Sequence, residues 1–337
     1  MTQTKPTTTG MLPESPPVPG LRPRFLTDDA DYPPLAELIR EAHAHDGIPW
    51  LPTADTVRLD LTPDVIDVTR DVVLVELDGR LVAMTAVPRE VRAGVPTYDL
   101  WGKVAPDLRR RGIGTWLLAW SIDQVRRRAE TEDPDGPVML GAHAGEQEAG
   151  ARAVYEAAGL RPVRHFFLMQ REHLDEVAPL PLPDRIEMRP VRPDQHRAIY
   201  DAGTEAFHDH WEPHDHGEEG FRQTYSQPDT NTDLWAVAWD GDQVVGVVET
   251  WIWSEENRRL NVRRGWLEKI SVRRPWRKRG VARALTAAAM IKLREAGMDE
   301  AMLGVDAQNP SGALGLYESL GFNVFRRSMA YRLPLER

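Results

Sequence analysis

A basic turn between a predicted strand and a predicted helix is the segment of this sequence best suited to bind an anion. The run Arg277–Ala282, with the sequence RKRGVA, follows a β-run that ends at Val272 and precedes a helical pattern. Unpaired main-chain N–H groups and the positive end of the helix dipole would meet there, and both attract phosphate. Gly280 leaves room for a diphosphate to approach the main chain. The spacing matches neither a P-loop nor a dinucleotide fingerprint, which argues against nucleotide hydrolysis and hydride transfer.

The same pattern occurs twice in the chain. Arg109–Gly114, with the sequence RRRGIG, lies 168 residues before Arg277–Ala282. Two Asp-Gly pairs, at Asp78 and Asp240, each lie between two β-runs and predict hairpins. The segments Ala151–Leu160 and Ala313–Phe322 also match each other. Three landmarks that recur in the same order indicate an internal duplication.

Composition suggests where the two copies begin and end. Residues 1–20 are rich in Thr and Pro, and we expect them to form a disordered leader. Residues 174–184 hold alternating prolines that forbid a helix, and we expect them to form a linker. The predicted domains are therefore an N-terminal domain over residues 21–173 and a C-terminal domain over residues 185–337.

Each half is predicted to be an α/β domain with a mixed sheet. Apolar residues at helical spacing predict long helices over Gly112–Ala129 and Gly280–Ala296. The expected strands after them are Val138–Gly141 and Ala301–Asp306, with Arg164–Gln170 and Val324–Leu333 as closing strands.

These motifs resemble those of the GNAT superfamily of N-acetyltransferases, whose acetyl-CoA site carries Gln/Arg-x-x-Gly-x-Gly/Ala after a strand. Both basic turns fit this pattern, and each is followed by a Leu/Val-Tyr-Glu-x-x-Gly-Phe/Leu element. The resemblance covers both halves. Their order is similar to the tandem GNAT arrangement, of which mycothiol synthase is an example. It implies two tandem acyl-CoA N-acyltransferase domains of the α/β (α+β mixed sheet) class. Acetyl-CoA is the implied co-substrate, with no metal.

The resemblance also implies which residues contact acetyl-CoA. In the family, the strand before the turn offers its main chain to the pantetheine arm and the acetyl oxygen, while the turn holds the diphosphate. The contacts implied in the second half are Ile270, Val272, Arg277, Lys278, Arg279, Gly280, Val281, Ala282, Arg283 and Asn309. Those implied in the first half are Val104, Arg109, Arg110, Arg111, Gly112, Ile113, Gly114 and Thr115.

Acetylation of an amine needs a group that takes a proton from the incoming ammonium. Glu268 lies four residues before Val272, so in a strand of period two it should share a face with Ile270 and Val272. Glu249, on the preceding strand, is the alternative base. Glu268 corresponds to Leu100 in the first half, which therefore keeps the turn and lacks this carboxylate.

The departing CoA thiolate needs a proton donor. Many family members place a tyrosine hydroxyl near the CoA sulfur, and by resemblance Tyr317 is the candidate general acid. The alternative for Tyr317 is a core tyrosine beside Leu316 and Leu320. Asn309, eight residues earlier, is the implied contact to the pantetheine arm.

A run of alternating histidines and carboxylates, Phe207–His216, has the residue types of a metal site. No further His-x-His or His-Glu-x-x-His pattern completes such a site, so we expect a loop and no metal. In the family this stretch lines the acceptor pocket. His208, Asp209 and Trp211 are therefore the expected acceptor contacts. The acidic residues of this stretch suit a cationic amine.

Composition restricts the remaining classes of function. The net charge of −10 argues against nucleic-acid binding through the basic turn, and no stretch of about 18 apolar residues predicts a membrane span. The chain has no cysteine and no signal-peptide pattern, which fits a cytoplasmic protein.

We therefore expect an enzyme that moves acetyl from acetyl-CoA to a primary amine of a small molecule, by direct attack, in the C-terminal domain. The N-terminal domain is expected to be a scaffold whose complete turn could hold a further CoA. The alternative is a non-catalytic acyl-CoA sensor or partner-binding protein, and Glu268 argues against it.

Overall fold

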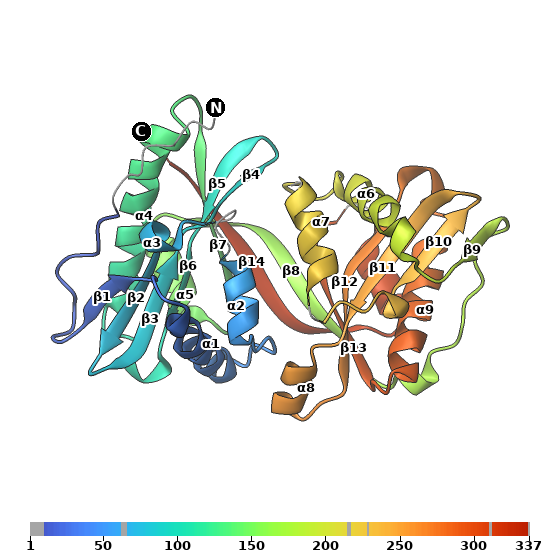
Figure 1. Cartoon of the computed structure of the whole chain (residues 1–337), viewed down its shortest axis with the longest axis horizontal. Coiled ribbons are helices and arrows are strands. Elements are labelled where there is room, and N and C mark those ends of the chain that lie inside the picture. The colour runs from blue at the N-terminus through green and yellow to red at the C-terminus, as the bar shows by residue number, and fades with distance from the viewer. Residues whose placement is uncertain (1–9, 62–65, 214–216, 228, 310–311, 336–337) are drawn as a thin grey trace. The chain divides into compact units, whose positions relative to one another are not determined.

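The computed structural model describes residues 10–61, 66–213, 217–227, 229–309 and 312–335. The chain forms two compact units, one of Met1–Val163 with Met329–Arg337 and one of Arg164–Ser328. Each unit is a mixed α/β layer, as the sequence predicts (Figure 1).

The first unit contains two groups of hydrogen-bonded strands. One has the order β1-β2-β3-β6, and the other has the order β4-β5-β7 followed by β14. Its strands are β1 (Arg22–Phe25), β2 (Val72–Leu77), β3 (Arg80–Ala86), β4 (Arg89–Arg92), β5 (Val95–Asp99), β6 (Trp101–Val104) and β7 (Val138–Gly145). Its helices are α1 (Tyr32–Asp46), α2 (Ala54–Asp60), α3 (Val68–Asp71), α4 (Ile113–Glu132) and α5 (Ala149–Ala157).

The second unit is a sheet with the strand order β8-β13-β12-β11-β10-β9. Its strands are β8 (Arg161–Arg171), β9 (Ile186–Met188), β10 (Ala236–Asp240), β11 (Gln243–Trp251), β12 (Arg264–Val272), β13 (Glu300–Asp306) and the start of β14 (Asn323–Leu335). Its helices are α6 (His196–Phe207), α7 (Gly217–Ser226), α8 (Ser254–Leu260), α9 (Val281–Glu295) and α10 (Ala313–Ser319).

The core of the second unit lies on both faces of its sheet. On one face, α6 contributes Ile199 to a cluster with Val247 and Trp251. On the other, α9 contributes Leu285 to a cluster with Val245 and others. The predicted helical spacing is confirmed, because Val281, Leu285, Ala289 and Leu293 of α9 are all buried. The sheet is thus held between the two helices (Figure 1).

Both predicted hairpins are confirmed. Leu77 pairs with Arg80, and Asp240 pairs with Gln243, so each loop has two residues. Asp78 and Gly79 both have positive φ angles, of 51° and 80°, as a primed two-residue turn requires.

The limits of the two units differ from the expected domains at two long strands. β8 starts in the first unit, but its residues Phe166–Arg171 pair antiparallel with β13 and complete the sheet of the second unit. β14 does the reverse, since its residues from Met329 onward belong to the first unit. The expected closing strands therefore exist. Most of β8 belongs to the second unit, and the end of β14 belongs to the first unit. The open edge of β13 explains the exchange, because an unpaired edge favours any strand that can cover it.

The proline-rich segment 174–184 packs against the second unit. Leu174 is fully buried and Leu182 packs on the same cluster as α9. The leader also differs from the expectation over residues 10–20, where Val18 is part of the first unit's core. Residues 1–9 of the leader lie outside the described residues.

Candidate active site

The turn before α9 keeps its main-chain donors open. Gly280 precedes the helix with a φ of 85°, and none of the described side chains caps it. The first helical hydrogen bond runs from the Ala284 N–H to the Gly280 carbonyl, so the N–H groups of Val281, Ala282 and Arg283 are left for solvent or a ligand. A Cβ atom added to Gly280 would meet no described atom within 4 Å. The turn therefore has room for an anion at its main chain.

Positive side chains surround this turn. Lys278, Arg279 and Arg283 are exposed, and none of them has an ion-pair partner in the described part of the chain. Lys278 also has a positive φ of 59°, which bends the main chain around the turn. The local charge favours a polyanion, although the whole chain is acidic.

The side chain of Arg277 points away from such an anion. Its Nε donates to the Val272 carbonyl at 2.8 Å, its Nη2 to the Ala206 carbonyl at 3.0 Å, and its Nη1 to Asp209 at 2.5 Å. Arg274 and Arg277 together hold the pKa of the Asp209 carboxyl well below its usual range. Arg277 is therefore a clamp between the turn and the end of α6. This placement differs from the expectation of a cofactor contact for the Arg277 side chain.

The first unit repeats this clamp. Arg109 donates from Nε to the Val104 carbonyl at 3.2 Å and forms two bonds to Asp46, of 2.6 and 2.9 Å, at the end of α1. The first arginine of each motif thus ties its turn to the preceding strand and to the first helix of its unit.

The strand β12 leaves its parallel neighbour part-way along its length. It pairs with β13 over Arg264–Trp266, whereas it pairs with β11 as far as Val272. The Arg273 N–H donates to the Val245 carbonyl of β11. Because main-chain groups alternate in direction along a strand, those of Ile270 and Val272 point away from β11, toward the side where β13 has separated. The Val272 carbonyl accepts a hydrogen bond from the Arg277 Nε at 2.8 Å.

Glu268 occupies a β-bulge at this point. Glu249 pairs with Lys269 and Thr250 with Leu267, so Glu268 has no opposite residue. The bulge interrupts the alternation on which the expected shared face of Glu268, Ile270 and Val272 rested. Ile270 and Val272 pack toward the α9 cluster, whereas the electrostatic neighbours of Glu268 are Glu249, Glu256 and Trp253.

The surroundings of Glu268 tune its acidity. Desolvation by nearby protein, followed by the negative charges of Glu256 and Glu249, raises the pKa of Glu268 to about 7, and a hydrogen bond from Trp253 opposes the rise. The Glu268 side chain is exposed to solvent, so water screens part of this effect. A carboxylate with a pKa near neutrality suits a general base.

The alternative base, Glu249, is enclosed. It is 4% exposed, and its Oε1 lies 3.6 Å from the Lys269 ammonium. Burial raises the pKa of Glu249, while Lys269 lowers it. The Lys269 ammonium also lies 5.2 Å from the centre of the Tyr200 ring on α6. Glu249 is therefore better placed to influence Glu268 than to meet a substrate.

The sequence analysis assigned no role to two neighbours of Glu268, Glu256 and Trp253. Glu256, on α8, is buried and accepts a hydrogen bond from the Trp266 indole at 3.0 Å. Trp253 stacks on Trp251 with ring centres 5.3 Å apart. The Trp-x-Trp spacing at the end of β11 was a visible signal for the aromatic pair. Glu256 gave none, because α8 must fold back over β12 before it comes near Glu268.

Tyr317 and Asn309 lie near the end of β13. Tyr317, on α10, is 6% exposed and lies edge-on to Phe322 at 6.1 Å within the α9 cluster. Burial raises its pKa, so the hydroxyl keeps its proton at neutral pH. Asn309 lies in a turn in which its N–H donates to the Asp306 carbonyl at 3.1 Å.

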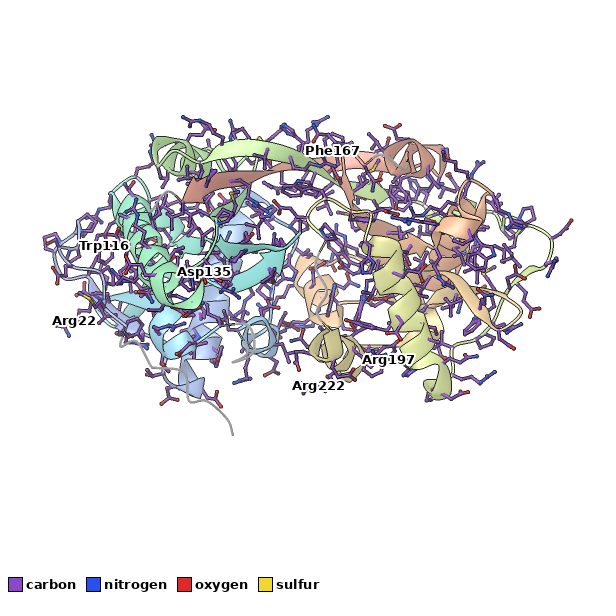
Figure 2. The ribbon with its side chains drawn as sticks, turned by 90° about the horizontal axis from the view of Figure 1, so that it is seen from above. Arg22, Trp116, Asp135, Phe167, Arg197 and Arg222 are labelled. Carbon is purple, nitrogen blue, oxygen red and sulfur yellow. The ribbon has the colours of Figure 1, made fainter. Side chains whose placement is uncertain are left out.

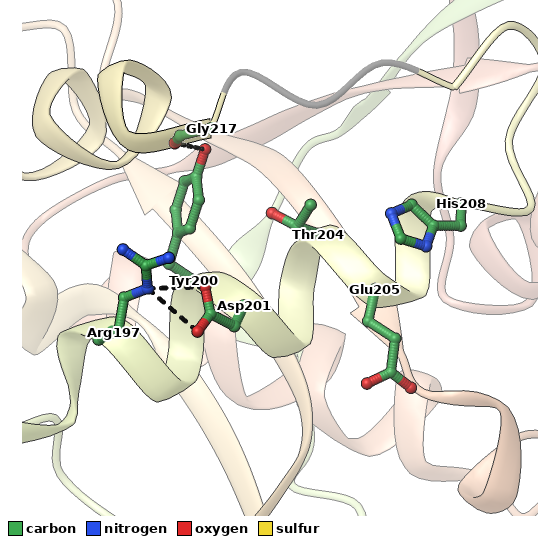
Figure 3. Close-up of a pocket in the computed structure, with 7 residues that line it drawn as sticks. All are labelled: Arg197, Tyr200, Asp201, Thr204, Glu205, His208 and Gly217. Carbon is green, nitrogen blue, oxygen red and sulfur yellow. Dashed lines mark hydrogen bonds and ion pairs between the residues drawn. The ribbon is translucent and has the colours of Figure 1, made fainter. Parts of the chain in front are cut away.

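The three expected acceptor contacts do not come together. His208 lines a recess of about 220 Å³ on α6 with Tyr200, Asp201 and Thr204 (Figure 3). Asp209 is held by Arg274 and Arg277, and Trp211 packs on Phe166 of β8 at 5.9 Å. Most of the residues that line the recess are polar, and the Tyr200 hydroxyl donates to the carbonyl of Gly217, which also lines it. His214–His216 of the predicted loop lie outside the described residues.

The corresponding turn of the first unit has the same main-chain form. Arg110 and Gly112 have φ angles of 63° and 82°, matching Lys278 and Gly280. Arg111 and Thr115 are exposed, Ile113 is buried, and Gly114 lies against Val104. Leu100 lies at the break between β5 and β6, where its N–H donates to the Gly141 carbonyl of β7. The first unit thus keeps the turn and the strand separation, with an apolar residue in place of Glu268.

Within the described residues, no cluster of three or more His, Asp or Glu side chains could hold a metal ion. In the same part of the chain, every helix is too short or too polar to span a membrane.

Comparison with known proteins agrees with this architecture. Residues 196–322 match the model of the acetyltransferase (GNAT) family. A mycothiol acetyltransferase from Kocuria rhizophila is 30% identical, over 88% of this chain and 94% of its own length. The same enzyme from Geodermatophilus obscurus is 28% identical, over 90% and 95%.

Solved structures show the same fold. A GCN5-related N-acetyltransferase from Sphaerobacter thermophilus superimposes with a TM-score of 0.72 at 28% identity, covering 95% of this chain and 97% of its own. A tandem GNAT protein from the clavulanic acid biosynthesis pathway gives a TM-score of 0.69 at 16% identity, covering 94% and 99%.

Proposed function

Because the chain belongs to the GNAT family of acetyltransferases and is an N-acetyltransferase with the tandem arrangement, we propose that its second unit carries out the transfer. In this proposal the open turn before α9 binds the diphosphate of acetyl-CoA. Main-chain N–H groups and the exposed Lys278, Arg279 and Arg283 supply the binding energy. The acetyl group then lies where β12 separates from β13, beside the main chain of Ile270.

Glu268 is the general base of the proposed reaction. It takes a proton from the acceptor ammonium, directly or through water, and the neutral amine attacks the thioester carbon. The C–N bond forms, the nitrogen releases its second proton to solvent and the C–S bond breaks, while the Ile270 main chain stabilises the developing oxyanion. Tyr317 returns a proton to the CoA sulfur. The observation that carries this proposal is the position of Glu268 in the bulge, with a pKa raised toward neutrality.

The acceptor is proposed to be a primary amine of a small molecule. The relatives are named for mycothiol, and the carboxylates of Glu249, Glu256 and Glu268 favour a cationic group near the bulge. A cytoplasmic location stays an expectation from the cysteine-free composition.

Glu268→Gln tests the base directly. The variant should lower kcat for amine-dependent thiol release by about 10²-fold or more, with the Kd for acetyl-CoA little changed. Glu255→Gln is the matched control, because Glu255 pairs with Arg258 and Arg259 on α8 and should keep wild-type turnover. An undiminished kcat in Glu268→Gln would transfer the role to another group. Acetyl-CoA binding without thiol release across a broad amine panel would support the acyl-CoA sensor instead.

A further inference from the structure

The leader of this chain is held along α4 of the first unit. The Trp116 indole donates to the Glu14 carbonyl at 2.7 Å, and the Trp120 indole donates to the Met11 carbonyl at 2.6 Å. Figure 1 shows this segment beside α4, and Figure 2 labels Trp116. Pro13 and Val18 are buried.

The leader runs along the helix toward the basic turn. Met11 lies at Trp120, Glu14 lies one helical turn earlier at Trp116, and Pro17 lies at Gly112. Its prolines favour an extended conformation whose carbonyls are free to accept, which is the form that aromatic grooves recognise. Prolines also reduce the entropy lost when the segment docks. Indole donors therefore suit this segment chemically.

The end of the leader occupies the approach to the turn. A Cβ atom added to Gly112 would lie 3.3 Å from the Pro17 Cβ, whereas one added to Gly280 would meet no described atom within 4 Å. Since a diphosphate must come close to the main chain at this glycine, Pro17 competes with it for the same space.

A comparison of the two sequence copies shows that only the first copy has the tryptophans that bind the leader. The positions 168 residues after Trp116 and Trp120 are Ala284 and Ala288. The second copy thus lacks both indole donors at the positions where the first copy binds the leader. The two turns have the same backbone form but different neighbours.

We propose that the first unit's turn is a docking site for the chain's own proline-rich leader, residues 10–20, and that the leader excludes acetyl-CoA from this unit. The proposal rests on the proposed function, in which such a turn binds acetyl-CoA. It replaces the expectation that the complete turn of the first half holds a further CoA.

Calorimetry with acetyl-CoA on variants that carry Gly280→Glu tests the proposal, because this substitution blocks the second unit's turn. The full-length variant should show no binding. Removal of residues 1–17, which keeps Val18 in the core, should create a binding site in the first unit. A synthetic peptide of residues 10–17, the described residues that the truncation removes, should then suppress that binding, and adding Gly112→Glu should abolish it.

The proposal would be overturned if the full-length Gly280→Glu chain binds acetyl-CoA and the additional substitution Gly112→Glu abolishes that binding. So would the absence of binding by a truncated chain with a wild-type circular dichroism spectrum. If truncation prevents folding, the full-length Gly280→Glu chain with Trp116→Phe and Trp120→Phe keeps an aromatic ring at each position and loses both N–H donors. That chain should gain acetyl-CoA binding, and the peptide should not suppress this binding fully because both indole donors are absent. If the chain gains no binding, the proposal is also contradicted. Failure of wild-type protein to bind acetyl-CoA would instead refute the proposed function.

Discussion

At the scale of single residues, the account depends on how the protein tunes Glu268. The sequence identified this glutamate by its distance from the turn, but its surroundings could not be predicted. The bulge depends on the register between β11 and β12, and a register shift leaves no mark on the local pattern. Glu256 reaches the same place through α8, which the period of a strand cannot indicate.

The raised pKa of Glu268 predicts an acid limb in the pH profile of kcat/KM. A base must be deprotonated to act, so activity should fall as the pH drops through about 7. Glu256→Gln removes one negative neighbour, which should lower the pKa of Glu268 and move the limb to lower pH. The amide oxygen can still accept from the Trp266 indole, so folding should be kept.

Rates measured from pH 5 to 9 with one amine check this prediction. A limb that does not move in Glu256→Gln, with thermal stability unchanged, would mean that Glu256 does not act on the base. A shift to higher pH would contradict the assigned sign of the interaction.

At the scale of elements, the two copies share a clamp that sequence reasoning interpreted differently. Local signals predicted the glycine turns, the hairpins and the long helices correctly, because each depends on residues close in sequence. The partners Arg277 and Asp209 are 68 residues apart, and Arg109 and Asp46 are 63 apart. Such pairs form only when the first helix of a unit packs beside its turn, so the local sequence does not predict them.

The clamp predicts that Asp209→Asn loosens the turn of the second unit. The Kd for acetyl-CoA should rise by at most about tenfold, because exposed ion pairs contribute little individually. Asp46→Asn breaks the equivalent clamp in the first unit and should leave this Kd unchanged. Isothermal titration of both variants checks the contrast, and equal weakening by the two would contradict it.

At the scale of the whole chain, sequence continuity and structural unit do not coincide. The sequence predicted β8 and β14 as strands, but the partner of a strand is set by which edge is open elsewhere in the fold. Met169 of β8 is fully buried in the cluster formed with α9, although it lies within the expected N-terminal domain, residues 21–173. Proline-rich composition marked the expected linker, yet Leu174 within it is also part of that core.

This exchange predicts where the second unit can be cut out of the chain. A fragment of residues 164–328 should unfold cooperatively on heating. A fragment of residues 174–328 lacks β8 and with it Met169, whose loss from a core costs about 2–5 kcal/mol for truncation alone. It should show no cooperative transition. Comparable melting of the two fragments by circular dichroism would show that β8 is dispensable to this unit.

Thiol release by Gly280→Glu, compared with Gly297→Glu, tests most directly whether the second unit's turn serves acetyl transfer. Both glycines flank α9 with similar φ angles, of 85° and 89°, and neither has a described atom near its Cβ position. The two substitutions therefore impose similar backbone strain at opposite ends of one helix. The account predicts that Gly280→Glu abolishes amine-dependent thiol release and Gly297→Glu retains it, whereas wild-type turnover in Gly280→Glu would contradict the account.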